Sequence, residues 1–403
     1  MPQATGVFKQ VAIKRETTYG TAPGVSGAAL LRRVQSTVDL SKDTYQSNEI
    51  RTDFQINDYR HGVRRIKGSV QGELSPGSYS DMFAAMLKRD FTAGVSTAGA
   101  SVTIAGTGPS YTLTRAAGSY LTDGFKLGDV VRLSVGTFNA ANINKNLLIV
   151  ALTATVATVY VLNSSALVAE GPIASATVAV QGKKTYIPTS GHTDVSYSLE
   201  HWFSDIAQSE LYTGIKFDKV QVDLPPTGMA KVNFDVLGQN ITTATARYFT
   251  SPTALGTKGV VAAVNGLLLV NGVVQAVVTG LQISIDPAFS GDPVVGSNVV
   301  PNQFAGPVNV TGQITAYFTD NTLRDLFVNE TETSLIVALT ADNTATSDVI
   351  SFALPRIKLG GQQKNDGTGG IAQTFPFQAL FNNAGGTGTA TEQTTITLQD
   401  TAA

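Results

Sequence analysis

The chain has 403 residues, a formal net charge of −2, 14% charged residues and no cysteine. This length allows two or three domains with real cores, and the near-neutral charge argues against a general nucleic-acid binder, which would show a basic excess. The absence of cysteine excludes disulfides and thiolate metal sites. Gly, Ala, Thr and Val are abundant, which favours short strands and many turns over helices.

The first segments of the chain are polar. No charged start followed by an apolar run occurs at the N-terminus, so we expect no secretory signal. Residues 42–60 are long, polar and charged, which predicts an exposed arm rather than a core element. A short basic run, 60–67, follows the acidic residues of this arm. Two interpretations are equally weighted: a solvated face with internal salt bridges, or an inter-subunit contact in which opposite charges set the register.

A helix of about three turns is predicted over 79–88, because Met82, Phe83, Met86 and Leu87 form one apolar face. Residues 92–188 then show a separate strand pattern, in 125–133, 146–152, 157–162 and 176–180. We interpret this segment as a small β-barrel or sandwich inserted in a loop and projecting outward.

The longest apolar stretch, 260–278, is interrupted by Asn265-Gly266 and Asn271-Gly272. These are hairpin turn signals, so the stretch is not predicted to span a membrane. A second helix is predicted over 321–330, with Asp320 or Asn321 as its cap.

An internal repeat is the strongest pattern in the sequence. Residues 61–74 align without a gap with 305–318, so that Gly62 falls on Gly306 and Gly68 on Gly312. The register continues into both predicted helices. Further matching segments occur in the same order, namely 36–39 with 283–286, 215–222 with 352–359, 228–231 with 370–373 and 232–237 with 375–380.

Residues that would support catalysis do not converge. The three histidines are His61, His192 and His201. His192 lies near Asp194 at a predicted strand entrance, and His201 lies beside Trp202, so packing roles are favoured for both. No metal-ligand spacing occurs, and the glycine-rich 367–370 lacks the context of a phosphate-binding loop. We predict no enzyme activity, no cofactor and no metal.

A duplicated domain indicates self-assembly. Two copies in one chain can occupy quasi-equivalent places in a closed ring, so three chains would form a pseudo-sixfold ring. Exposed sheet edges would then be completed by neighbours.

Two segments of the chain resemble a known family. Residues 15–23, Arg-Glu-Thr-Thr-Tyr-Gly-Thr-Ala-Pro, are similar to the start of the tail tube (major tail) proteins of long, flexible-tailed bacteriophages. Residues 47–51 through 72–77 also resemble that family, and 252–257 faintly echo the N-terminal motif. The resemblance covers most of the first copy and is looser in the second.

The resemblance implies a mainly β fold with two tandem tail-tube-like β-sandwich or half-barrel domains, each flanked by one α-helix, and an inserted small β-barrel or sandwich. The expected domains are 1–91 with 189–245, the insert 92–188, and 246–403. The resemblance also implies a virion tail protein, assembled in the host bacterial cytoplasm, whose stacked rings form a hollow tube with a bore that is usually acidic.

The same resemblance implies partners. These are other copies of the chain in homotrimeric or alternatively homohexameric rings, a tape measure protein in the bore, tail terminator and distal tail proteins at the ends, and double-stranded DNA that passes without sequence-specific binding. No membrane is involved. The duplication departs from one-domain members and favours trimeric rings.

The arms 42–62 and 287–306 are expected to bridge rings or subunits, with further edge contacts from the N-terminal segment and from 391–400. The candidate contact residues are Tyr45, Glu49, Arg51, Asp53, Asp58, Arg60, Arg64, Arg65, Asp292 and Asn298. The alternative is another self-assembling virion or surface protein, such as a fibre or a decoration protein. A β-rich carbohydrate-active enzyme is the third candidate, and a sugar-binding role for the insert alone stays open.

Overall fold

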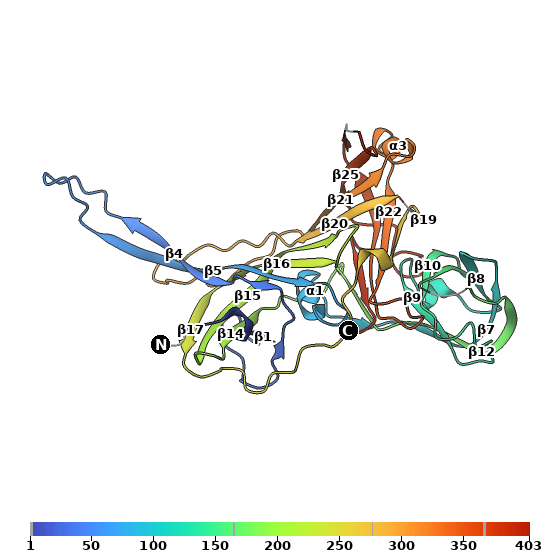
Figure 1. Ribbon diagram of the computed structural model, residues 1–403, viewed down its shortest axis with the longest axis horizontal. Helices are drawn as coiled ribbons and strands as arrows, with labels where there is room; N and C mark the ends of the chain where they lie inside the picture. Colours follow the sequence, from blue (N-terminus) through green and yellow to red (C-terminus); the bar gives the residue numbers. More distant parts are fainter. Residues whose placement is uncertain (1–2, 164–165, 276, 366–367) are drawn as a thin grey trace.

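A computed structural model describes residues 3–163, 166–275, 277–365 and 368–403. The fold is mainly β, as predicted, with three short α-helices in the described ranges (Figure 1). Two short 3-10 helices, η1 (Gly6–Phe8) and η2 (Ala263–Asn265), precede strands.

One antiparallel sheet runs through both halves of the chain. Its strands alternate buried and open residues, as a sheet with one covered face requires. In spatial order the strands are β3 (Gln35–Ser36) with β4 (Asp39–Gln46), β5 (Tyr59–Glu73), β16 (Lys231–Gly238), β15 (Gln208–Leu224), β20 (Val278–Asp286), β21 (Asn309–Tyr317), β25 (Ala372–Ala379), and β23 (Val349–Leu359) with β24 (Gln363–Lys364).

The two halves meet at a backbone ladder. Strand β15 of the first half pairs with β20 of the second, with Val220 opposite Ile285 and Leu224 opposite Leu281. The order of pairing is the same on each side of this junction, β4–β5–β16–β15 and then β20–β21–β25–β23. The ladder therefore joins two four-strand units into one eight-strand sheet.

Two glycines mark equivalent positions in these units. Gly68 faces Val236 and Gly312 faces Phe377. At both glycines the neighbouring backbone approaches so closely that a Cβ atom would collide with it. Val236 is thus the equivalent of Phe377, so the sequence match that placed Phe234 on Phe377 is wrong by two residues. An even shift keeps every side chain on its face, which is why the hydrophobic pattern did not reveal it.

Two other matches are shifted as well. The match of 215–222 with 352–359 is wrong by five residues, because Phe217 faces β16 where Leu359 faces β25. A shift by an odd number of residues would turn the side chains to the opposite face of the sheet. The β-bulge between Phe217 and Lys219 in β15 inserts one residue and so compensates for it. Upstream, Asp39 faces Lys67 and Ser284 faces Thr311, the residues that precede the two glycines. That match is therefore also two residues out.

Shorter strands extend the sheet. The first half adds β1 (Lys9–Arg15), β2 (Ala29–Leu30), β14 (Tyr197–Phe203) and β17 (Asn240–Ala244). Around the second half lie β6 (Thr92–Ala93), β13 (Lys183–Tyr186), β18 (Gly266–Val270), β19 (Val273–Val274), β22 (Thr333–Thr340) and β26 (Thr397–Asp400). The Asn271-Gly272 turn between β18 and β19 has positive φ at both residues, as predicted for a hairpin.

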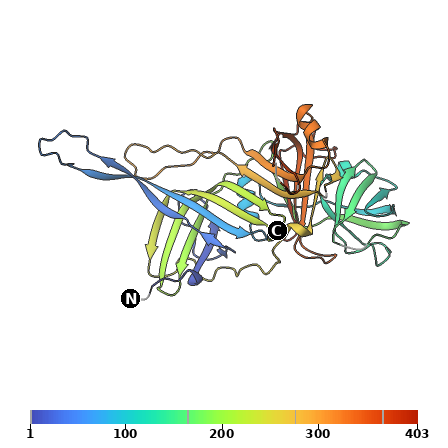
Figure 2. The same cartoon turned by 45° about the horizontal axis from the view of Figure 1, so that its top comes forward.

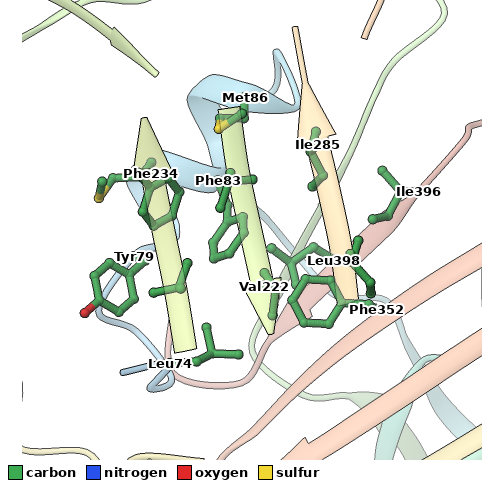
Figure 3. Close-up of a cluster of buried hydrophobic side chains, with 14 of the residues drawn as sticks. Leu74, Tyr79, Phe83, Met86, Val222, Phe234, Ile285, Phe352, Ile396 and Leu398 are labelled. Atoms are coloured by element: carbon green, nitrogen blue, oxygen red, sulfur yellow. The ribbon is translucent and has the colours of Figure 1, made fainter. Parts of the chain in front are cut away.

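The two repeat helices have unlike surroundings. Helix α1 (Ser80–Met86) is buried between the first-half sheet and strands of the second half, and its Phe83 lies 5.3 Å from Phe234 and 6.1 Å from Phe352 between ring centroids (Figure 3). Helix α3 (Thr322–Val328) stands at an end of the molecule (Figure 1) and buries only Leu323. Phe83 is 3% exposed, whereas Phe327, its counterpart in the sequence repeat, is 40% exposed.

Both helices are shorter than the three turns predicted. Each has seven residues, since the chain leaves the helical conformation at Lys88 and at Glu330, where φ is positive. Asn321 is the N-cap residue of α3 but its side chain makes no capping hydrogen bond; the Oδ1 of Asp320, one residue earlier, accepts a 2.8 Å hydrogen bond from the backbone N–H of Thr322 instead. The positive-φ residues end both helices before a third turn forms.

The inserted segment forms a closed six-strand barrel, one of the two forms predicted. Its strands are β7 (Ser96–Ala105), β8 (Ser110–Arg115), β9 (Val130–Ser134), β10 (Leu147–Leu152), β11 (Val156–Val161) and β12 (Glu170–Val180). The short helix α2 (Tyr120–Asp123) contributes Tyr120 to the barrel core. In both overall views the barrel lies at the end opposite to the β4–β5 hairpin (Figures 1 and 2).

The barrel packs on the second half although it is inserted in the first. Val130 and Leu148 share an apolar cluster with Leu269, Ile336 and Val349. A buried ion cluster supports the same contact. Lys184 Nζ lies 3.3 Å from an Asp129 carboxylate oxygen and 3.4 Å from Glu392, so barrel, linker and C-terminal segment share one cation. Removing one member would leave uncompensated buried charge, which fixes the barrel's place.

The contrast between the helices yields a stability test. We expect Phe83→Ala to cost about 3–5 kcal/mol, because it opens a cavity in a core shared by both halves. The matched change Phe327→Ala should cost less than about 1 kcal/mol in the free chain, because its ring is partly solvated. Urea denaturation followed by fluorescence measures both, and equal costs would contradict the difference in burial.

Candidate assembly surfaces

The longest projection of the molecule is the outer part of the β4–β5 hairpin, residues 42–65, here called the first arm. It leaves the body as a twisted two-strand ribbon (Figures 1 and 2). Its tip, 47–58, carries no described strand, and its end is almost wholly exposed. The arm predicted from polarity therefore exists as a hairpin. The contact roles of its residues stay predictions.

The charges of the arm are paired within it. Arg51 donates to Asp53 at 2.6 Å, and Arg60 Nε donates to Asp58 at 2.8 Å. Arg65 lies 3.6 Å from Asp43. Glu49 joins this network, because it accepts a 2.7 Å hydrogen bond from the Asn57 amide. Arg64 does not, since it donates to the neutral side chain of Asn240 on β17 at 2.9 Å.

These pairs change proton affinities in the expected direction. The hydrogen bonds from Arg51 lower the pKa of the Asp53 carboxyl, and those from Arg60 lower the pKa of Asp58. Both carboxyls therefore stay ionised near neutral pH. Exposed pairs of this kind contribute little to stability. The exposed apolar side chains are therefore the distinctive feature of the tip.

Sequence reasoning missed those apolar side chains because it weighed the charges. Ile50, Phe54 and Ile56 at the tip are exposed, Phe54 at 99%, with Tyr45 and Tyr59 half-exposed along the ribbon. Phe54 also has a φ of 58°, which is unusual for a bulky residue. The signal was present in the sequence as Ile50, Phe54 and Ile56 inside a polar segment. Such a cluster on a projecting loop is typical of a contact surface.

The second arm, residues 287–306, is irregular and runs beside the first in both views (Figures 1 and 2). The backbone N–H of Arg64 donates to the Asn298 carbonyl at 2.8 Å, and Gln239 donates to the carbonyl of Val300 at 3.0 Å. Of the two candidates on this arm, Asn298 therefore contacts the first arm in the same chain, while Asp292 is exposed.

Two buried lysines hold the root of the second arm. Lys88 Nζ lies 4.3 Å from the centroid of the Phe289 ring, and Lys216 Nζ lies 5.2 Å from it. Lys216 also donates to Asp194 at 2.8 Å and to the Gln303 carbonyl at 2.7 Å. Burial lowers the pKa of Lys88 to about 8. The second arm is thus anchored to the first half by cation–π and hydrogen-bond contacts.

The eight-strand sheet is open at β3 and β4 at one end and at the two-residue strand β24 at the other, while β23 continues into β22 and β26. In the described part of the chain, β3 and β4 pair only with β5, and β24 pairs only with β25. Apolar side chains stand near the β24 end, with Phe318 at 36% and Phe327 at 40% exposure, next to Val328 and Ile371. Open edges and exposed aromatic side chains at one end of a monomer are features of an unfilled interface.

His201 has the packing position that was favoured for it, but His192 does not. His192 is exposed, and its neighbour Asp194 pairs with Lys216 instead. His201 is buried, with its Nε2 2.8 Å from Ser36 Oγ and its Nδ1 3.6 Å from Glu210. The sequence of contacts from Ser36 through His201 to Glu210 resembles the catalytic triad of a hydrolase. However, Ser36 is buried, whereas a catalytic nucleophile must be accessible to its substrate. The contact is an internal polar cluster.

Two further observations concern the described ranges. They contain no group of three or more His, Asp or Glu side chains placed to hold a metal ion. No helix in them is long and apolar enough to cross a membrane.

The geometry is therefore that of a mainly β protein with open strand edges and projecting arms, as expected of a subunit of a larger assembly. The sequence model of the phage tail tube protein family matches residues 9–379, so the chain belongs to that family. It is a structural component of the virion, and the tube of the phage tail is its place of action. The match spans both halves and the barrel. A comparison with curated proteins gave no match.

His201 gives the first half a pH dependence. Burial lowers its pKa below the ordinary 6.5, with Glu210 opposing this and Lys9 and Arg33 adding to it. The unfolded chain then binds a proton that the native chain does not, so stability falls as pH drops through about 6.5. We expect thermal midpoints to fall between pH 7 and about 5.5, above the Glu210 range, and to fall less in His201→Gln. An equal fall in both proteins would contradict the assignment.

Proposed function

We propose that three copies of this chain close into a ring through the two open edges of the sheet, and that stacked rings form the tail tube. The observation that carries this proposal is the β15–β20 ladder inside the chain. That ladder joins the last strand of one four-strand unit to the first strand of the next. The same kind of joint between chains would repeat it around a circle.

A domain division underlies this proposal. Residues 1–91 with 189–245 form the first tail-tube unit, 246–403 form the second, and 92–188 are an insert. The same strand order on both sides of the junction and the equivalent glycines support a duplication. Three chains then supply six units. Because one β15–β20 joint per chain is already made, three joints between chains complete the circle.

The internal joint also specifies the register between chains. Within the chain Gln221 faces Ser284. Gln221 lies opposite Asn233, just as Gln363 of β24 lies opposite Thr374, the residue equivalent to Asn233 in the glycine-based alignment. Since Asp39 is the equivalent of Ser284, Gln363 of one chain should face Asp39 of the next. The different burial of the two helices supports the same joint. Strands of the second half cover α1, whereas α3 is exposed in the single chain and would be covered by strands of the next chain.

The arms would connect successive rings. The exposed tip of the first arm, with Ile50, Phe54 and Ile56, supports this role, and so does its distance from the barrel end (Figure 1). Around the assembled tube we propose the partners that the family resemblance implies: a tape measure protein and passing duplex DNA in the bore, terminator and distal tail proteins at the ends, and assembly in the host cytoplasm. The barrel would decorate the outside.

Cross-linking tests the joint and counts the chains. The chain contains no cysteine, so Asp39→Cys with Gln363→Cys introduces one defined pair per joint. Directly opposite residues have Cβ atoms about 4.5–5.5 Å apart, near disulfide reach. We expect oxidation of assembled protein to give a ladder on non-reducing gels that ends at three chains. Electron microscopy of tubes seen end-on should show the same number.

The controls separate register from proximity. Each single cysteine variant should give no ladder, and Ser41→Cys with Gln363→Cys, two residues out of register, should cross-link at least tenfold less. A ladder that ends at six chains would replace the trimer with a hexamer. Tubes that form without any Asp39–Gln363 cross-link would overturn the proposed joint.

Deletion of 45–59 tests the first arm. The segment projects beyond the body and carries no core side chain, so we expect a folded monomer with an unchanged thermal midpoint that no longer forms tubes. The matched variant Arg51→Gln with Asp53→Asn, which keeps the apolar tip, should still polymerise. Normal tubes from the deletion variant would reject the bridging role.

A further inference from the structure

One face of the eight-strand sheet is polar from edge to edge. A single row of directly opposed residues crosses all eight strand positions, and seven of its eight side chains are uncharged amides or hydroxyls. The row consists of Gln35, Gln71, Asn233, Gln221, Ser284, Thr311, Gln378 and Lys358. The residues that alternate with this row point into the core, as Val70, Val222 and Ile283 do. We call this surface the polar wall.

Three lysines of the polar wall stand opposite a carboxylate in the ladder. Lys67 faces Asp39, and Lys219 faces Asp235. Lys231 lies between two acids, since it pairs with Glu73 on β5 and with Asp223 on β15.

Lys358, at the end of the uncharged row, lies 3.9 Å from Glu330 Oε2. Asp286 adds one further carboxylate on β20. The wall thus carries four lysines against six carboxylates, a small acidic excess in which a carboxylate lies near each lysine.

The shape of the sheet indicates which face looks inward. An open hollow of about 580 Å³ lies on the polar wall, lined among others by Lys219, Gln282, Gln313 and Gln378. The opposite face carries α1 and the shared core (Figure 3). The concave side of the sheet is thus the polar side.

The expected diameter of the proposed ring also indicates that the polar wall faces inward. In the proposed ring, about 24 strands spaced about 4.8 Å apart give a circumference of about 115 Å and a diameter of about 37 Å, before strand tilt widens it. Three copies of the core layers, helices and barrel cannot fit within that diameter. They must lie outside, so the polar wall lines the bore.

We propose that the polar wall is the surface along which duplex DNA moves, and that its cross-strand lysine–carboxylate pairs keep the phosphates from binding to it. This inference rests on the proposed ring. The lining it describes is rich in amides and has a small acidic excess, which agrees in sign with the acidic bore expected from the family resemblance. It adds lysines that each have a carboxylate nearby.

The physical argument concerns counterions. A lysine that neutralises a phosphate releases condensed counterions, and this release is the main source of non-specific affinity for DNA. The Cβ atoms of directly opposite residues lie about 4.5–5.5 Å apart, which is shorter than the Debye length of about 8 Å, so solvent ions screen the opposed charges from each other only in part. Toward the bore, the lysine and its carboxylate act as a dipole and not as a free positive charge. Exchanging the carboxylate for a DNA phosphate therefore gives the lysine little additional electrostatic stabilisation.

The location of the wall is tested by labelling. Gln282→Cys on the wall and Thr107→Cys on the exposed barrel each add one thiol to the cysteine-free chain. In the free chain a long polyethylene glycol maleimide should modify both. In tubes it should modify Thr107→Cys at the same rate but Gln282→Cys at least tenfold more slowly, while a small maleimide still reaches both. Equal rates for the long reagent in tubes would overturn the inward placement.

The charge pairing is tested at Lys231. Glu73→Gln with Asp223→Asn leaves this lysine unpaired, and the triple variant that adds Lys231→Gln removes the whole cluster. A fluorescent duplex is sedimented with tubes, and its binding to unassembled protein is measured in parallel. We expect weak retention by the wild type, at least tenfold more by the double variant with a salt slope steeper by about 0.9 per lysine freed, and a return to the wild-type level in the triple variant.

The outcomes separate this inference from the ring proposal. Retention that is equal in all three proteins, or high in the triple variant, would overturn the pairing argument whether or not tubes form, because the wall is also open in the free chain. A wild-type protein that forms neither tubes nor rings would instead contradict the proposed ring, and the binding comparison on unassembled protein would still decide the role of the pairs.

Discussion

The backbone ladder between β15 and β20 is the constraint on which the architecture depends. It is made of main-chain hydrogen bonds, so many sequences could form it, but its register is strict, because a slip of one residue would exchange Val222 and Ile283 with the polar side chains beside them. The buried residues on both strands belong to one core cluster with α1. The junction therefore joins the two halves into one sheet and at the same time gives that sheet one apolar and one polar face.

The same junction explains why equivalent sequences have different environments. Phe83 and Phe327 occupy matching places in the repeat, yet only Phe83 is covered, because β23 and β26 of the second half close over α1 (Figure 3). The carboxylate of Asp400 at the end of β26 accepts hydrogen bonds from Gly77 and Ser80 at the start of α1. The end of the chain thus covers part of the first half, whereas among the described residues no segment covers α3 in the same way.

Local signals in the sequence were sufficient for local structure. The Asn271-Gly272 turn, the helix around Phe83 and the strands of the insert follow from residue type and periodicity. Long-range placement was not accessible in this way. The sequence match followed the aromatic residues Phe234 and Phe377 and so missed the true register, which the glycines fix through close backbone approach.

Other features depend on segments far apart in the chain. The docking of the barrel on β22 and the clamping of Phe289 by Lys88 and Lys216 arise from contacts over long separations. Composition marked the first arm as exposed, but the pairing of its charges with one another became apparent only when the hairpin brought Asp43 beside Arg65. For the candidate residues, this internal pairing moves the emphasis from the charges to the apolar tip.

Several lysines of this chain have a carboxylate nearby, both in the interior and on the open polar face. In the interior, Lys184 and Lys216 are compensated by carboxylates at 3.3 Å and 2.8 Å, because an unpaired buried charge would be too costly. On the open polar face desolvation imposes no such demand, yet Lys67 and Lys231 also have carboxylates opposite them in the ladder. Since exposed pairs add little to stability, folding alone does not account for this arrangement. The proposed role of this face as the lining along which DNA moves does account for it, because each opposed lysine then offers the phosphates little net gain in counterion release.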